Sequence, residues 1–177
     1  MDRADFARQS RARGDGLHFS DALTDRLAGF VRDVGIAVEA ATLPDATLLP
    51  GLDIRGGVVR IDQARLLYPG DILHEAGHVA VSDPASRHAA EFSSTDGGEE
   101  MAAIAWSYAA ACRLGVAPEM VFHPQGYRGG AAALVENFTA GRYIGVPLLQ
   151  WWGMALEPRL AQAQGIAPYP HMLRWLR

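Results

Sequence analysis

The sequence contains no lysine: all sixteen basic residues of the 177-residue chain are arginine. Without a lysine amine, the chain cannot form a Schiff base with a carbonyl substrate or build a phosphate-binding loop that needs a lysine. Cysteine is almost absent as well. Cys112 is the only one, so it cannot form a disulfide within the chain, and a single thiol mildly favours a reducing compartment.

Long apolar runs and a strong charge of one sign are also lacking. The most apolar stretch, 101–112, ends at Arg113 and is too short to span a bilayer. Residues 1–16 are charged and contain no apolar signal core. A net charge of −4 gives no electrostatic basis for binding nucleic acid or an anionic membrane. We therefore expect a cytoplasmic protein with no membrane span and no nucleic-acid partner.

The remaining composition is that of a globular protein, with 49% hydrophobic and 20% charged residues. Residues 1–16, rich in arginine, aspartate and glycine, are predicted to form a flexible N-terminal segment. Residues 17–177 fit a single domain that is large enough to bury a hydrophobic core.

The first half of this domain is predicted to hold one helix and a small sheet. Ser20 is a suitable N-cap for a helix over 21–34, and a short strand follows at 36–40. Two further strands within 52–61 flank Gly56-Gly57, a pair that suits a two-residue hairpin turn.

Helices dominate the second half. Asp71 is a plausible N-cap for the first of them, and Pro147 suits the first turn of the last, which carries Trp151 and Trp152. We expect this apolar last helix in the core or in a homo-oligomer contact. Helices are predicted over 71–82, 98–115, part of 130–141, and 147–164, with short helical pieces in 116–130. The expected class is therefore α+β, a short N-terminal sheet followed by a mostly helical core.

The most informative segment is His74-Glu75-Ala76-Gly77-His78. On a helix, positions i and i+4 lie on one face, so the two imidazoles can bind one metal ion. Glu75 lies beside them, where it can take a proton from a metal-bound water. The segment resembles the zincin pattern, which implies Zn²⁺ as the metal, His74 and His78 as ligands, and Glu75 as general base.

Catalytic zinc usually has a third protein ligand. The metzincin layout fails, because Val81 and Pro84 occupy its required glycine and histidine positions. The order of elements instead resembles gluzincins, in which a glutamate on the following helix is the third ligand, and this resemblance implies Glu99 or Glu100. Asp96 and Glu99 have the spacing of a capping box, which would employ Glu99 locally and favours Glu100 for the metal. Glu99 remains the alternative.

The pentapeptide also resembles membrane-tethered ATP-dependent zinc proteases, whose third ligand is an acid much further along the chain. That resemblance implies Glu136, although the sequence shows neither an ATPase module nor a membrane span. A further group often stabilises the oxyanion in such chemistry. His123, Tyr127 and Tyr143 are candidates, and no spacing rule selects among them.

These features predict a minimal zincin-like domain that acts as a zinc-dependent hydrolase. The expected substrate is a peptide or protein, cleaved at an amide bond by metal-activated water with Glu75 as base. The alternative is a metal-binding regulatory or interaction module that has the motif but no turnover.

Overall fold

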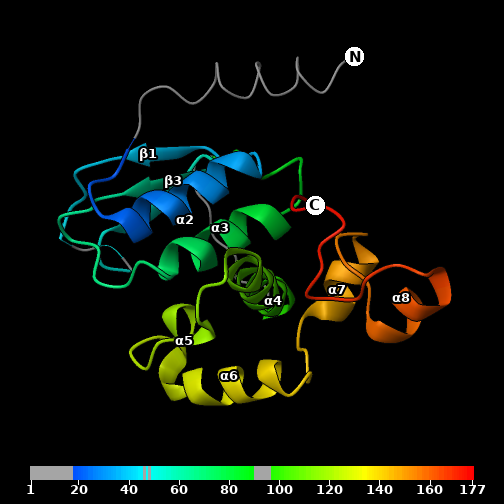
Figure 1. Ribbon diagram of the computed structural model, residues 1–177. Coiled ribbons are helices and arrows are strands. Elements are labelled where there is room, and N and C mark those ends of the chain that lie inside the picture. Colours follow the sequence, from blue (N-terminus) through cyan, green and yellow to red (C-terminus); the bar gives the residue numbers. More distant parts are fainter. Residues whose placement is uncertain (1–17, 46, 48, 90–96) are drawn as a thin grey trace.

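The computed structural model describes residues 18–45, 47, 49–89 and 97–177. The predicted flexible segment 1–16 and the predicted cap Asp96 lie outside these ranges. Within them the chain is α+β, with a three-stranded sheet that precedes most of the seven α-helices (Figure 1). The predicted class, a short sheet followed by a mostly helical core, is confirmed.

The sheet comprises β1 (Val38–Ala40), β2 (Leu52–Arg55) and β3 (Val58–Ile61) in the order β1-β3-β2. β1 pairs with β3 in parallel, and β2 pairs with β3 antiparallel. Gly56 and Gly57 form the predicted hairpin turn. Their φ angles of 60° and 75° are left-handed, as a two-residue turn between twisted strands requires.

The first described helix, α2, spans Ala22–Asp33. Its N-cap is Asp21 and not the predicted Ser20, because the Asp21 carboxylate accepts a hydrogen bond from the Thr24 amide at 2.7 Å. The next helix, α3 (Asp71–Val81), also begins differently from the prediction. Gly70 is its N-cap, while Asp71 is the first helical residue and points its carboxylate elsewhere.

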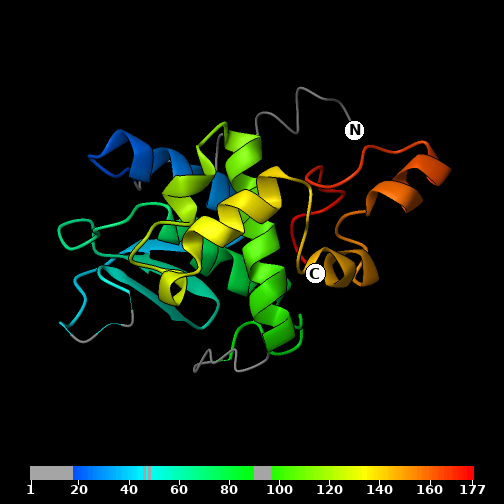
Figure 2. The same cartoon turned by 90° about the horizontal axis from the view of Figure 1, so that it is seen from below.

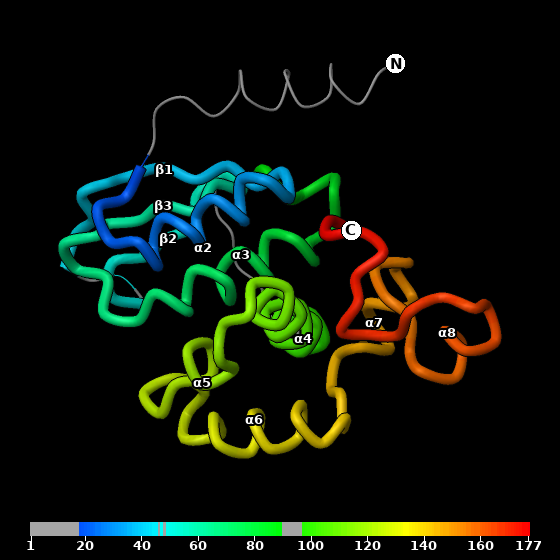
Figure 3. The backbone as a smooth tube through the Cα atoms, in the orientation of Figure 1, coloured from blue at the N-terminus to red at the C-terminus, as the bar shows by residue number. Residues whose placement is uncertain are grey.

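Helix α3 lies between two layers. It contacts α2, β2 and β3 on one side and packs mainly on α4 (Gly97–Leu114) on the other. In Figures 1 and 3, α4 passes through the middle of the molecule, with the sheet, α2 and α3 above it. The central turns of α4 are buried and rich in alanine, which lets neighbouring helices approach its backbone. The core therefore lies around α3 and α4.

The predicted short helical pieces after α4 are present as α5 (Pro118–Val121) and the 3₁₀ turn η1 (Tyr127–Gly129). The predicted helix within 130–141 is α6 (Ala131–Thr139). Figure 2 shows α6 lying across α4, viewed from below.

The predicted single helix over 147–164 is wrong. Two short helices replace it, α7 (Val146–Trp151) and α8 (Pro158–Gln164). Gly153 adopts a left-handed φ of 69° after α7, and Pro158, which lacks an amide hydrogen, starts a new helix. Between the two helices, Ala155 forms an isolated antiparallel β-bridge with Met172. No helix in the described part of the chain is long and apolar enough to cross a membrane.

Candidate metal centre and active site

The motif residues are the only part of α3 that is not fully buried. Eight of its eleven residues are buried, and the other three are His74, Glu75 and His78. The wedged position of the helix explains this pattern, since the sheet and α4 cover every other face. The side chains of His74 and His78 are 12% and 11% exposed, so only a small part of each imidazole is accessible to solvent.

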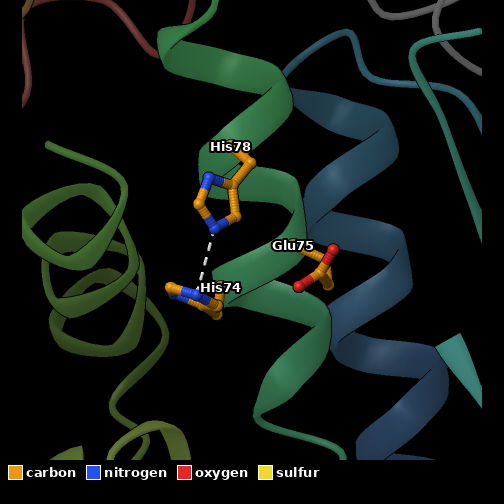
Figure 4. A group of neighbouring side chains, drawn as sticks. All are labelled: His74, Glu75 and His78. Atoms are coloured by element: carbon orange, nitrogen blue, oxygen red, sulfur yellow. Dashed lines mark hydrogen bonds between the residues drawn. The ribbon is translucent and has the colours of Figure 1, made fainter. Parts of the chain in front are cut away.

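The two imidazoles face each other. Figure 4 shows both rings on the same side of α3, and their Nε2 atoms lie 3.1 Å apart. Glu75 lies beside them on the same helix, and one donor atom from each of the three residues lies within 4.8 Å of the others. The predicted i, i+4 arrangement of the histidines is therefore present.

Glu100, on α4, also lies within 4.8 Å of both histidines. Its carboxylate oxygens lie 3.6 Å from Nε2 of His74 and 3.2 Å from Nε2 of His78. Ligand atoms bound at the usual distances in a tetrahedral zinc site lie roughly 3.3–3.5 Å from one another. The two Nε2 atoms lie 3.1 Å apart, and each has a different Glu100 oxygen at 3.6 or 3.2 Å, so the donor atoms already have close to this spacing. The Glu100 side chain is 44% exposed, so solvent reaches the cluster from its side.

Gly77 explains how α4 can bring Glu100 to the histidines. A Cβ atom at position 77 would lie 2.8 Å from the carbonyl oxygen of Ala103, closer than real Cβ contacts allow. The glycine inside the motif therefore lets the backbones of α3 and α4 touch. Residue 100 lies one turn before this contact on α4, at the level of the imidazoles.

Glu99, the alternative third ligand, has a different partner. Its carboxylate lies 3.4 Å from a guanidinium nitrogen of Arg177, near the end of α3. The predicted capping partner Asp96 lies outside the described residues. Consecutive residues of a helix point about 100° apart, so Glu99 and Glu100 face different neighbours.

Without a bound metal, the residues of this cluster differ in the direction and cause of their pKa shifts. Burial, reinforced by the neighbouring His78, lowers the pKa of His74, which favours its neutral, metal-binding form. Burial alone would also lower the pKa of His78, but hydrogen bonding to Glu100 and nearby carboxylate charges raise it above its ordinary value. Burial raises the pKa of Glu75 to about 7, close to the value that suits a general base at neutral pH.

A second histidine–carboxylate pair lies next to this cluster. Nε2 of His123 is 2.9 Å from Oδ1 of Asp71, both side chains are buried, and Tyr68 stacks on the imidazole at 3.9 Å. Asp71 therefore holds His123 instead of capping α3. Sequence reasoning missed this pairing, because no spacing rule connects residues 52 positions apart.

Tyr127 is an oxyanion candidate that contacts the metal cluster directly. Its ring stands edge-on to His74 with the centroids 5.3 Å apart, and its hydroxyl is buried without a hydrogen-bond partner among the described residues. Burial, then the charges of nearby carboxylates, raises its pKa, so the hydroxyl stays protonated. Its backbone has a left-handed φ of 56°, which is unfavourable for a bulky residue and is often found at functional sites.

The other two candidates from the sequence lie elsewhere. Tyr143 packs against Phe138 and Tyr169 in an aromatic cluster. Glu136 is on the surface, with its side chain 77% exposed and paired to Arg142 at 2.9 Å. Neither of them contacts the motif residues in the described structure.

A cavity of about 650 Å³ opens in another region of the protein. It lies between α2, the C-terminal end of α4 and Trp175, and none of its lining residues belongs to the motif. No family model matches the chain, and no curated protein or solved structure is significantly similar to it.

Proposed function

We propose that this protein is a zinc-dependent hydrolase of peptide or related amide bonds. The observation that carries the proposal is that Nε2 of His74 and Nε2 of His78 lie 3.1 Å apart, and that each faces one carboxylate oxygen of Glu100, Oε1 at 3.6 Å from His74 and Oε2 at 3.2 Å from His78. Two imidazoles and one carboxylate form a ligand set that suits zinc and leaves one coordination position open.

Zinc in such a site acts as a Lewis acid that polarises a substrate carbonyl and lowers the pKa of water. Glu75 is the base. With a pKa of about 7 in the metal-free protein, its carboxylate can accept a proton from the attacking water and pass it to the leaving amine. Its donor atom lies within 4.8 Å of those of His74 and His78, a distance that supports a role as base beside the metal.

Tyr127 supplies the remaining group in this proposal. Its buried, protonated hydroxyl has no partner among the described residues, so it is available to donate a hydrogen bond to the carbonyl oxygen as negative charge develops there. His123 is less suited to this role, because its Nε2 is already held by Asp71.

The expected partner is a peptide or protein substrate. Cys112 is exposed and forms no disulfide, which fits a reducing compartment such as the cytoplasm. The second candidate function, a metal-binding regulatory or interaction module without turnover, has one observation in its favour. The 650 Å³ cavity, large enough for a small ligand, is not lined by motif residues.

The test combines metal analysis with a peptide library. Purified wild-type protein should contain one zinc per chain and cleave a subset of peptides, detected by mass spectrometry. Glu75→Gln should retain zinc and lose activity by a factor on the order of 10²–10⁴. Glu136→Gln, which changes an exposed acid away from the motif, is the matched control and should retain full activity.

Each outcome decides between the candidates. A wild-type protein that binds no zinc would refute both. Zinc binding without any hydrolysis that depends on Glu75 would favour the regulatory module.

A further inference from the structure

Arg177 closes the C-terminal end of the motif helix α3. Its backbone amide donates to the carbonyl oxygen of Ala80 at 3.0 Å, and its guanidinium donates to that of Val81 at 3.3 Å. The guanidinium of Arg87 in turn donates to the carbonyl oxygen of Arg177 at 3.0 Å. The last carbonyls of a helix have no partner within the helix, so Arg177 satisfies groups that α3 leaves open.

The same side chain reaches the first turn of α4. One guanidinium nitrogen lies 3.4 Å from Oε1 of Glu99, and the guanidinium carbon lies 4.3 Å from the ring centre of Trp152. The side chains of Arg177 and Glu99 are only 24% and 25% exposed, so their ion pair is partly shielded from water. One residue thus connects the end of α3 with the beginning of α4.

This connection joins the two helices that carry the proposed metal ligands. His74 and His78 come from α3, and Glu100 follows Glu99 on α4. Gly77 sets how closely the two helices approach, and the Arg177–Glu99 ion pair adds a contact at the first turn of α4. Holding Glu99 at the end of α3 fixes the first turn of α4, and the adjacent Glu100 is then directed at the imidazoles.

We propose that Arg177 is a positioning residue for the metal centre, which it orders through Glu99 without contacting the metal. The inference rests on the zinc site of the proposed function but does not require turnover. Coupling of this kind is reciprocal: if docking of Arg177 favours zinc binding, then zinc must favour docking of Arg177. The C-terminal segment would therefore regulate, and report, the occupancy of the site.

The test measures zinc affinity by competition with a chromophoric chelator. Arg177→Gln should weaken zinc binding about tenfold, as expected for a residue that orients a ligand. Arg177→Lys should restore part of the loss, because it keeps a positive charge near Glu99. The double variant Glu99→Gln/Arg177→Gln should bind no more weakly than Arg177→Gln, because both changes break the same contact.

Arg174→Gln is the matched control. Arg174 belongs to the same segment, but its guanidinium donates to the carbonyl oxygen of Trp152 and not to α4. This variant should bind zinc like the wild type. A second measurement tests reciprocity: zinc should slow hydrogen exchange in residues 172–177 of the wild type, but not of Glu99→Gln.

The outcomes separate this inference from the proposed function. If the wild type binds zinc and Arg177→Gln binds it equally well, even with a lower melting temperature, Arg177 has only a structural role. If the wild type does not bind zinc, the proposed metal site itself is wrong, whatever the variants do.

Discussion

Two histidine–carboxylate clusters lie within one turn of each other on α3, and they differ in composition. At the start of the helix, one imidazole meets one carboxylate: His123 and Asp71 bind each other at 2.9 Å, beneath a stacked tyrosine ring. One turn later, two imidazoles share the carboxylate of Glu100. In the first cluster, Nε2 of His123 is engaged by Asp71, while its Nδ1 has no hydrogen-bond partner among the described residues. The second brings two Nε2 atoms together, an arrangement that a cation between them would stabilise.

We therefore expect the ratio of imidazoles to carboxylates, and not burial, to distinguish a structural pair from the proposed metal site. Both clusters lie in the same layer of the protein and both are largely shielded from water. Only the second opens to solvent, through the half-exposed side chain of Glu100. Four experiments test the distinction and the packing around it, from the largest expected effect to the smallest.

The largest effect is expected from removing an imidazole. His78→Ala should weaken zinc binding by about a thousandfold or more, because each ligand supplies a large share of the metal's binding free energy. His123→Gln, which changes the other cluster, should leave zinc affinity within about threefold of the wild type. Isothermal titration calorimetry measures both. Equal losses in the two variants would mean that the clusters are not distinct.

The next variants compare the two neighbouring glutamates. Glu100→Gln removes a proposed ligand and should weaken zinc binding by about a hundredfold. Glu99→Gln weakens the contact with Arg177 and should cost about tenfold. Cobalt substitution provides the measurement, since the visible spectrum of the bound ion changes when a ligand is lost. A larger effect for Glu99→Gln would make Glu99 the ligand.

A smaller effect is expected at the contact between the helices. Gly77→Ala adds a methyl group 2.8 Å from the Ala103 carbonyl oxygen and should lower the free energy of unfolding by about 1–3 kcal/mol. Urea denaturation of the metal-free protein measures this change. The control is Gly97→Ala on α4, where an added Cβ has no neighbour within 4 Å among the described residues. If both variants unfold alike, the close contact at Gly77 does not set the packing.

The smallest effect concerns pH. Burial raises the pKa of Asp71 above its ordinary value of 3.8, and the hydrogen bond from His123 offsets only part of this rise. Between these two pKa values the folded protein binds more protons than the unfolded chain, so its stability falls as pH increases. Asp71→Asn removes this contribution.

The stability of Asp71→Asn relative to the wild type should therefore improve as pH rises from about 4 to about 7. Chemical denaturation of the metal-free proteins at several pH values measures the difference. Curves that stay parallel across this range would show that Asp71 does not titrate in a buried environment.

Local patterns in the sequence predicted much of the fold. The hairpin at Gly56-Gly57 follows from turn chemistry, and the helices that became α3 and α4 follow from apolar periodicity and length. The C-terminal helix was predicted incorrectly, because its apolar residues suggested continuity across Gly153 and Pro158. There the backbone conformation of two residues outweighed a favourable hydrophobic pattern.

The candidate site could likewise be predicted only in part from the sequence. The facing of His74 and His78 follows from helical spacing alone. The capping argument for Glu100 stays a prediction, because Asp96 lies outside the described residues, and the structure adds Arg177, a residue 78 positions away, as a partner of Glu99. The pairing of Asp71 with His123 and the left-handed backbone of Tyr127 also depend on contacts distant in sequence. Such contacts produce no periodic pattern in a single amino-acid sequence.

The lack of room at position 77 has a consequence for evolution. A chain that keeps this centre while the rest of its sequence drifts must retain glycine immediately before the second histidine, since even alanine would push the two helices apart. It must also keep an acid 22 residues later, as Glu100 follows His78. Distant homologues could thus be recognised by this spacing of residues, even where the rest of the sequence is no longer similar.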